Sequence, residues 1–218
     1  MKYAELLKKS GRLEVVCGSM FSGKTEELMR RLKRAEFAKQ NVLTIKHQID
    51  TRRNCACIVS HDGKERVAFS ISDQGDGIEL DKIWELADDT VDVIGIDEVQ
   101  FFPNKIVDVI YRLVNKGKRV IVAGLDLDFR GEPFGVMPIL LSLADDVLKL
   151  KAICVVCARE AHYSQRLIDG EPARYHDPLI LVGASEFYEP RCRDCFQIDK
   201  QPVFHVPDYG QMIQNQNQ

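Results

Sequence analysis

The chain has 218 residues, of which 45% are hydrophobic and 29% are charged, so it can form a buried core and is not a disordered chain. Its length predicts one to two domains. Lys and Arg number 30 and Asp and Glu number 33, which gives a net charge of −3. This balance argues against a protein that grips nucleic acid phosphates over a broad surface.

No run of about 18 apolar residues occurs, and no apolar run of about 7–15 residues follows the first lysines. The sequence therefore predicts neither a transmembrane helix nor a secretory signal. We expect a cytoplasmic protein with no membrane and no nucleic acid partner. Seven cysteines in that reducing compartment suggest metal ligands or catalysis before disulfides.

Strand and helix patterns alternate over the first 150 residues. Short apolar, β-branched runs predict strands over 13–17, 42–45, 91–96 and 120–123. Good helix formers or apolar residues at helical spacing predict helices over 25–40, 106–114 and 140–147. Such alternation favours an α/β fold whose mainly parallel sheet is covered by helices on both faces.

Two regions interrupt this alternation. Residues 51–80 are polar, and the Asp62-Gly63 pair between two extended runs predicts a hairpin. Near Lys149 the alternation stops and the cysteine pairs begin. We therefore expect an α/β domain over 1–149, a small cysteine-containing domain over 150–206 and a polar tail over 207–218 that is disordered at its end.

A phosphate-binding loop follows the first predicted strand. The run Gly18-Ser19-Met20-Phe21-Ser22-Gly23-Lys24-Thr25 fits G-x-x-x-x-G-K-[ST], with a strand before it and a helix after it. Glycines let backbone N–H groups curl around phosphate oxygens, and the helix N-terminus adds partial positive charge. Lys24 is expected to reach the β- and γ-phosphates, and the Thr25 hydroxyl to ligate Mg²⁺.

Two acids end the third predicted strand. Because the carboxyl ends of parallel strands meet at one crevice, Asp97 and Glu98 should face the phosphate loop. Asp97 is expected to hold Mg²⁺. Glu98 could accept a proton from an attacking hydroxyl or water, or merely cap the next turn. These residues predict use of a nucleoside triphosphate with Mg²⁺ and do not choose between an ATPase and a kinase.

Two C-x-x-C pairs predict a zinc site. Cys154, Cys157, Cys192 and Cys195 can supply four thiolates, a closed tetrahedral shell that is typical of structural Zn²⁺. The long stretch between the pairs exceeds the spacing of common zinc ribbons, and long loops pinned in this way are usually functional. Redox activity of one pair is the alternative.

Taken together, these motifs resemble the type II (cellular) thymidine kinases. The resemblance runs from Leu13 to about Phe196 and rests on the phosphate loop, the run Asp97-Glu98-Val99-Gln100-Phe101-Phe102-Pro103 and the zinc-anchored loop called the lasso, here Cys154 to Cys195. Shorter matches are Asp50-Thr51-Arg52, Leu125-Asp126 with Phe129, and Pro133-Phe134-Gly135. The resemblance implies a P-loop (RecA-like) α/β fold with a small zinc-binding lasso domain.

It also implies an activity, the transfer of the ATP γ-phosphoryl group to the 5′-hydroxyl of thymidine. Glu98 matches the family's catalytic base, and Asp50, Arg52 and Gln100 fall with the phosphate-binding residues. The implied nucleoside contacts come from Met20, Phe102, Leu125, Phe129, Phe134, the lasso strand Leu179-Ile180-Leu181-Val182-Gly183, and Tyr188. A homotetramer and feedback inhibition by thymidine triphosphate (dTTP) are further implications.

Two other functions stay open from the residues alone. A nucleotide-switched zinc-binding adaptor needs only the phosphate loop and Asp97. In such a protein the lasso would bind a partner protein. A helicase-like ATPase needs a nucleic acid track, which the acidic balance disfavours.

Overall fold

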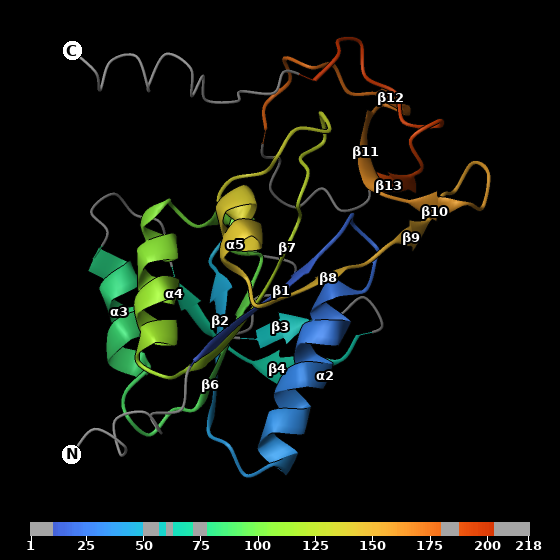
Figure 1. Ribbon diagram of the computed structural model, residues 1–218. Coiled ribbons are helices and arrows are strands. Elements are labelled where there is room, and N and C mark those ends of the chain that lie inside the picture. The colour runs from blue at the N-terminus through green and yellow to red at the C-terminus, as the bar shows by residue number, and fades with distance from the viewer. Residues whose placement is uncertain (1–10, 50–56, 60–62, 72–77, 180–187, 203–218) are drawn as a thin grey trace, which may run out of the picture.

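The computed structural model describes residues 11–49, 57–59, 63–71, 78–179 and 188–202 (Figure 1). The N-terminal part is a six-stranded parallel sheet with the strand order β5-β2-β6-β7-β1-β8. Its strands are β1 (Arg12–Cys17), β2 (Val42–His47), β5 (Phe69–Ile71), β6 (Val93–Asp97), β7 (Arg119–Gly124) and β8 (Asp146–Lys149).

Alternate residues of the central strands enter two different cores. Val15 and Ile94 belong to the larger core, whereas their neighbours Val16 and Val93 belong to the smaller one on the other face. This period of two is what a strand buried on both faces produces. The strands therefore read as continuous apolar runs in the sequence.

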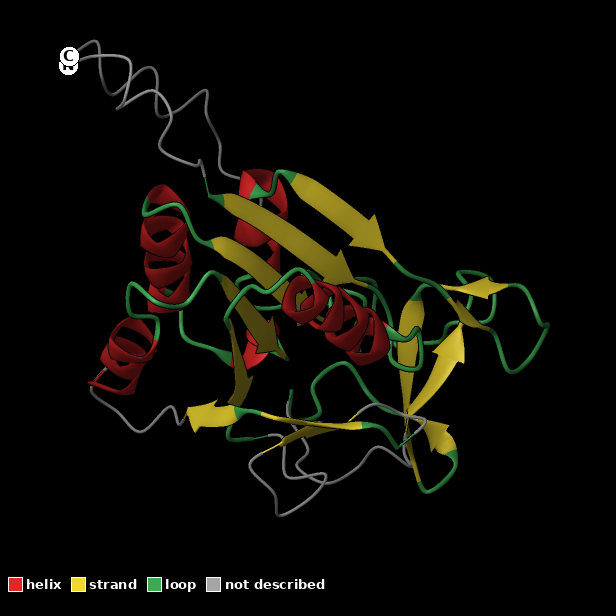
Figure 2. Cartoon of the chain, turned by 90° about the horizontal axis from the view of Figure 1, so that it is seen from below, coloured by secondary structure: helices red, strands yellow, loops and turns green. Residues whose placement is uncertain are grey.

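Helices cover both faces of the sheet (Figure 2). Helix α2 (Lys24–Phe37) packs on the smaller core through Leu28, Leu32 and Ala35, beside the hairpin of β3 (Cys57–Val59) and β4 (Glu65–Val67). The larger core is covered by α3 (Ile78–Leu86), α4 (Lys105–Asn115) and α5 (Met137–Leu143). A short 3₁₀ helix, η1 (Val99–Phe101), follows β6.

After Lys149 the chain forms two small antiparallel sheets, which we call the zinc-binding unit. One pairs β9 (Ala152–Ile153) with β10 (Glu160–Ala161), and the other has the order β12-β11-β13. Strand β11 spans Tyr163–Ile168, β12 spans Glu171–Pro172 and β13 spans Tyr188–Arg191. The unit's small core contains Ala152, Ala161 and the four cysteines of the two C-x-x-C pairs.

The predicted fold class is confirmed, and so is the hairpin on either side of Asp62-Gly63, because Val59 pairs with Glu65. The helix predicted over 140–147 is wrong at its end: α5 stops at Leu143 and Val147 lies on β8, which pairs with β1. Strand β5 and helix α3 were not predicted. Cys57 is buried and disulfide-bonded, which differs from the expectation that the cysteines serve as metal ligands or in catalysis before disulfides. The tail 207–218 lies outside the described residues.

Within the described part of the chain, none of the helices combines the length and the apolar character needed to span a bilayer.

Candidate active site and zinc centre

The phosphate loop connects β1 to α2 as its sequence predicts. Gly18 has a φ of 140°, and a Cβ there would lie 2.3 Å from the carbonyl oxygen of Leu150, so only glycine fits. Lys24 is buried, and its Nζ donates to the carbonyl oxygen of Ser19 at 2.8 Å. The loop therefore curls around its own ammonium group, which puts positive charge within the predicted phosphate-binding loop.

Thr25 and Asp97 meet at the end of the sheet. The Thr25 hydroxyl donates to Asp97 Oδ2 at 3.0 Å, and both side chains are buried. The other carboxylate oxygen, Asp97 Oδ1, accepts the N–H of Glu98 at 3.0 Å. A hydroxyl and a carboxylate beside a phosphate loop are oxygen ligands of the kind that Mg²⁺ takes, so the donor set fits this ion.

Glu98 has a left-handed backbone conformation with φ 52°. This conformation is uncommon for a residue other than glycine and is found preferentially at functional sites. Its side chain is half-buried, and Glu98 Oε2 accepts a hydrogen bond from Gln100 Nε2 at 2.7 Å.

Gln100 is itself fixed from its other end. Its Oε1 accepts the N–H of Leu125, just after β7, at 3.0 Å. A Cβ on Gly124 would lie 2.5 Å from this oxygen, so the glycine makes room for the amide. The buried amide therefore links the carboxylate after β6 to the backbone after β7.

The phosphate loop also touches the zinc-binding unit. The N–H of Met20 donates to Ser164 Oγ on β11 at 2.9 Å, and Ser19 Oγ contacts the carbonyl oxygen of Ala161 at 3.4 Å. In addition, the N–H of Leu150 donates to the carbonyl oxygen of Cys17 at 2.8 Å. The unit is thus hydrogen-bonded to the predicted phosphate-binding loop.

Aromatic residues predicted to wall the base differ in their surroundings. Phe129 is buried and lies against the guanidinium of Arg166 on β11. Phe102 packs in the larger core with its ring edge against His47, and Phe134 packs edge-on against Phe101. Their contact with a base stays a prediction.

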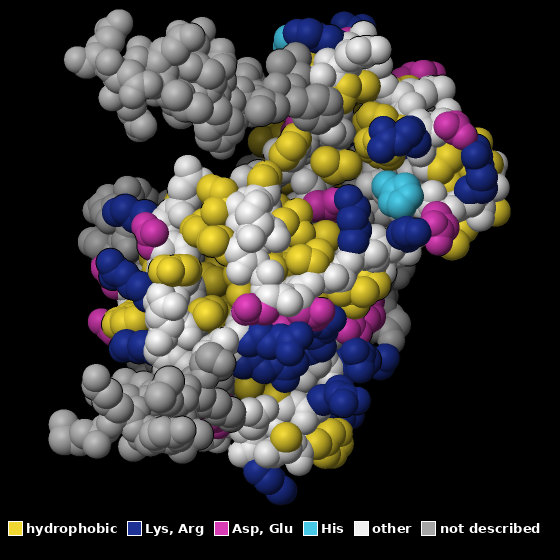
Figure 3. Space-filling view, in the orientation of Figure 1, with side chains coloured by type: hydrophobic (Ala, Val, Ile, Leu, Met, Phe, Trp, Pro, Cys, Tyr) yellow, Lys and Arg dark blue, Asp and Glu magenta, His cyan; other side chains and the backbone are white. Residues whose placement is uncertain are grey.

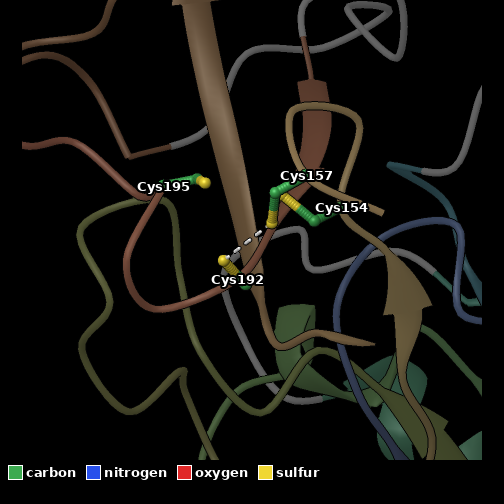
Figure 4. A group of neighbouring side chains, drawn as sticks. All are labelled: Cys154, Cys157, Cys192 and Cys195. Carbon is green, nitrogen blue, oxygen red and sulfur yellow. Dashed lines mark hydrogen bonds between the residues drawn. The ribbon is translucent and has the colours of Figure 1, made fainter. Parts of the chain in front are cut away.

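The four cysteines of the two C-x-x-C pairs come together (Figure 4). Their sulfur atoms all lie within 4.8 Å of one another, and Cys157 Sγ is 3.5 Å from Cys192 Sγ. Ligands of a tetrahedral Zn²⁺ at about 2.3 Å have sulfurs about 3.8 Å apart, so the cluster fits zinc and has no open position.

The thiols of this cluster affect one another's ionisation. Burial opposes ionisation of Cys154, but N–H donors of Cys192, Cys157 and Val156 lower its pKa to about 6. The hydrogen bond with Cys192, together with burial, raises the pKa of Cys195 to about 12. One thiolate therefore forms readily and the next is disfavoured, a conflict that a bound dication relieves.

The phosphate loop and the cysteine cluster agree with the family that the chain matches. A family model described as thymidine kinase matches residues 11–196. The chain belongs to the thymidine kinase family.

Most of the site residues predicted for this thymidine kinase family member follow the carboxyl ends of β1, β6 and β7. The others that the structure describes lie in the zinc-binding unit. Leu179 is exposed, and Tyr188 is half-buried on β13. Asp50, Arg52 and 180–183 of the lasso strand lie outside the described residues, so their roles stay predictions.

Ser164 and Arg166 of this thymidine kinase family member were not predicted as site residues. Both lie on β11 and contact parts of the site. No motif marks them, since the run from Tyr163 to Ile168 has three consecutive polar residues and fits no binding or metal-ligand pattern.

Proposed function

We propose that this protein transfers the γ-phosphoryl group of ATP to the 5′-hydroxyl of thymidine and gives thymidine monophosphate. The Glu98 carboxylate supports the proposal most strongly, because it accepts a hydrogen bond from Gln100 Nε2 at 2.7 Å. The backbone N–H of Glu98 donates to Asp97 Oδ1, and Asp97 Oδ2 accepts the hydroxyl of Thr25 in the phosphate loop. A nucleotide switch needs the phosphate loop and Asp97 alone. A kinase also needs a nearby carboxylate that another side chain holds in the orientation for accepting the hydroxyl proton.

The chain's residues have separate tasks in this reaction. Lys24 neutralises charge on the transferred phosphate, and the Glu98 carboxylate orients the 5′-hydroxyl and takes its proton. Gln100 keeps that carboxylate in place. Thr25 and Asp97 would hold Mg²⁺, which when bound supplies positive charge to the phosphate oxygens. Because phosphoryl transfer depends on alignment and charge neutralisation, these groups suffice without covalent catalysis.

The zinc-binding unit is assigned to the nucleoside. We propose that it forms a domain over 150–206, in which a structural Zn²⁺ bound by the four cysteines holds the two ends of the lasso together. Backbone groups of residues 179–183, with Leu125 and Phe129, then bind the pyrimidine. dTTP would bind as a nucleoside and phosphate mimic and inhibit the enzyme.

We further propose a cytoplasmic homotetramer. Support comes from β8, which lies at the edge of the sheet, and from the exposed side chains Ile139, Leu143 and Val147. Hydrophobic side chains gather around α5 in Figure 3. An open strand edge beside exposed apolar side chains is a surface that a second copy can cover.

A phosphoryl-transfer assay with ATP, Mg²⁺ and a panel of nucleosides tests the proposal. We expect thymidine to be the acceptor and Glu98→Gln to lower kcat by about 10²–10⁴-fold, as loss of a general base does. The control is Glu171→Gln, at an exposed position on β12. Activity of Glu98→Gln within a few fold of wild type would remove Glu98 from its role.

A thermal shift assay separates the kinase from the adaptor. Only a ligand that binds the native state raises the unfolding midpoint. Thymidine and dTTP should therefore raise it, while purine nucleosides should not. Stabilisation by ATP alone would favour the adaptor.

A further inference from the structure

Arg166 is a buried cation with no carboxylate partner among the described residues. It is the largest side chain in the structure that is fully buried, with 0% exposure. Its Nη1 donates to the carbonyl oxygen of Pro178 at 2.6 Å, while Nε and Nη2 are buried and have no hydrogen-bond partner among the described residues. Arginine stays charged in proteins, and a buried charge without a counter-ion costs stability.

An apolar side chain of similar volume would avoid that cost. Replacing buried ionic groups with well-packed apolar residues is often neutral or stabilising. Packing alone therefore does not explain an arginine at this position, and its contacts point to another role.

The contacts of Arg166 lie on the nucleoside side of the site. Its guanidinium carbon lies 3.7 Å from the centroid of the Phe129 ring, a stacked cation–π arrangement. Pro178, its hydrogen-bond acceptor, immediately precedes the predicted lasso strand that begins at Leu179. One planar group thus fixes both an aromatic ring and the backbone from which that strand starts.

The pleat of β11 puts Arg166 on the face of the strand that meets the site. Ser164, two residues earlier, accepts the N–H of Met20 in the phosphate loop. Residues two apart on a strand share a face and lie about 6.6 Å apart. Tyr163 and Gln165 alternate with them and contact Phe196 and Gln197 instead.

Arg130 acts on the same two features from the loop after β7. Its Nη2 donates to the carbonyl oxygen of Asp177 at 3.1 Å, and its guanidinium lies 5.2 Å from the Phe129 ring centroid. Two arginines therefore hold the adjacent carbonyl groups of Asp177 and Pro178, just before the predicted lasso strand, and the buried arginine lies over the ring.

We infer that Arg166 is a positioning residue for the nucleoside, which acts through Phe129 and the Pro178 carbonyl. The inference rests on the proposed function. Loss of the guanidinium should loosen the base-binding side of the site and leave the phosphate loop intact. It should therefore raise the KM for thymidine and leave the KM for ATP unchanged.

The test uses Arg166→Lys, which keeps the charge but loses the planar stacking group, and Arg166→Met, which also removes the charge. We expect the KM for thymidine to rise tenfold or more in both variants, with the KM for ATP within twofold. The unfolding midpoint of Arg166→Met should not fall, because the variant relieves a buried charge. Zinc content, measured in parallel, should stay at the wild-type level.

The matched control is Arg191→Met. Arg191 is a largely buried arginine of the same small sheet, but its guanidinium binds Glu189 at 2.5 Å. Its thymidine KM should stay within twofold of wild type, which separates the proposed role from general loosening of the sheet.

The remaining outcomes overturn either the inference or the proposed function. A thymidine KM within twofold of wild type, or an equal rise in both KM values, overturns the inference. Failure of both variants to fold also overturns it, since Arg166 would then be required for the fold. A wild-type protein that does not phosphorylate thymidine instead refutes the proposed function.

Discussion

Replacing Gln100 with methionine tests whether a buried amide holds the proposed catalytic carboxylate in place. The Gln100 side chain is 3% exposed and bonds Glu98 Oε2 at 2.7 Å and the N–H of Leu125 at 3.0 Å. Methionine has a similar length and no hydrogen-bond donor. Gln100→Met therefore removes both hydrogen bonds with little change in packing.

The expected loss follows from the charge of the acceptor. A hydrogen bond to a charged group contributes roughly 1.5–3 kcal/mol. If this bond keeps Glu98 aimed at the hydroxyl in the transition state, kcat falls by about 10- to 150-fold. The Leu125 N–H also loses its acceptor, which should lower the free energy of unfolding by about 1–3 kcal/mol.

Two measurements separate these effects, namely kcat at saturating thymidine and ATP, and urea unfolding followed by circular dichroism. Gln165→Met is the matched control, because Gln165 is 2% exposed and its amide bonds the carbonyl oxygen and N–H of Gln197 at 3.0 and 2.8 Å. It should lose similar stability and keep its kcat within twofold. A Gln100→Met enzyme with kcat within twofold of wild type would refute the orienting role of the amide.

Two further predictions concern pH and zinc. The hydrogen bond from Arg30, opposed by partial burial and assisted by Arg31, lowers the pKa of Glu27 to about 2 from an ordinary 4.5. The resulting stabilisation is complete above pH 4.5 and is lost as the pH falls toward 2. The difference in thermal unfolding midpoint between wild type and Glu27→Gln should therefore shrink over that range. A difference that stays constant in thermal melts would contradict this. Chelation or Cys192→Ser should weaken thymidine binding more than ATP binding in calorimetric titrations, because the proposed zinc would hold both ends of the lasso. Equal loss of both would mean that zinc supports the whole fold.

Features encoded by adjacent residues were predictable from the sequence. The phosphate loop, the acids after β6 and the two C-x-x-C pairs each depend on local spacing, and the structure forms the loop between β1 and α2 and gathers the cysteines. Strand β8 was missed because its apolar spacing also fits a helix. The chain leaves the helical conformation at Ala144, and pairing of Val147 with Val15 makes the following residues a strand.

Contacts between distant residues were not predictable in this way. The Met20–Ser164 hydrogen bond joins residues 144 positions apart, and the Gln100–Leu125 bond joins two different strand ends. Neither Ser164 nor Gln100 has a local pattern that reveals its partner, since only the packing of the zinc-binding unit on the sheet brings Ser164 to the loop. Tertiary packing thus decides which polar residues meet, while local spacing decides which motifs exist.

These contacts also bear on how phosphate and nucleoside binding depend on each other. The Met20 N–H is committed to Ser164, so this amide of the phosphate loop anchors the zinc-binding unit. On the same strand, Arg166 holds Phe129 and the stem of the predicted lasso strand. A shift of β11 would therefore disturb both halves of the proposed site at once, whereas loss of the Arg166 guanidinium alone should disturb only the half proposed to hold the base. Chelation should therefore weaken the binding of both ATP and thymidine, and thymidine more strongly. The Arg166 variants should raise the KM for thymidine alone.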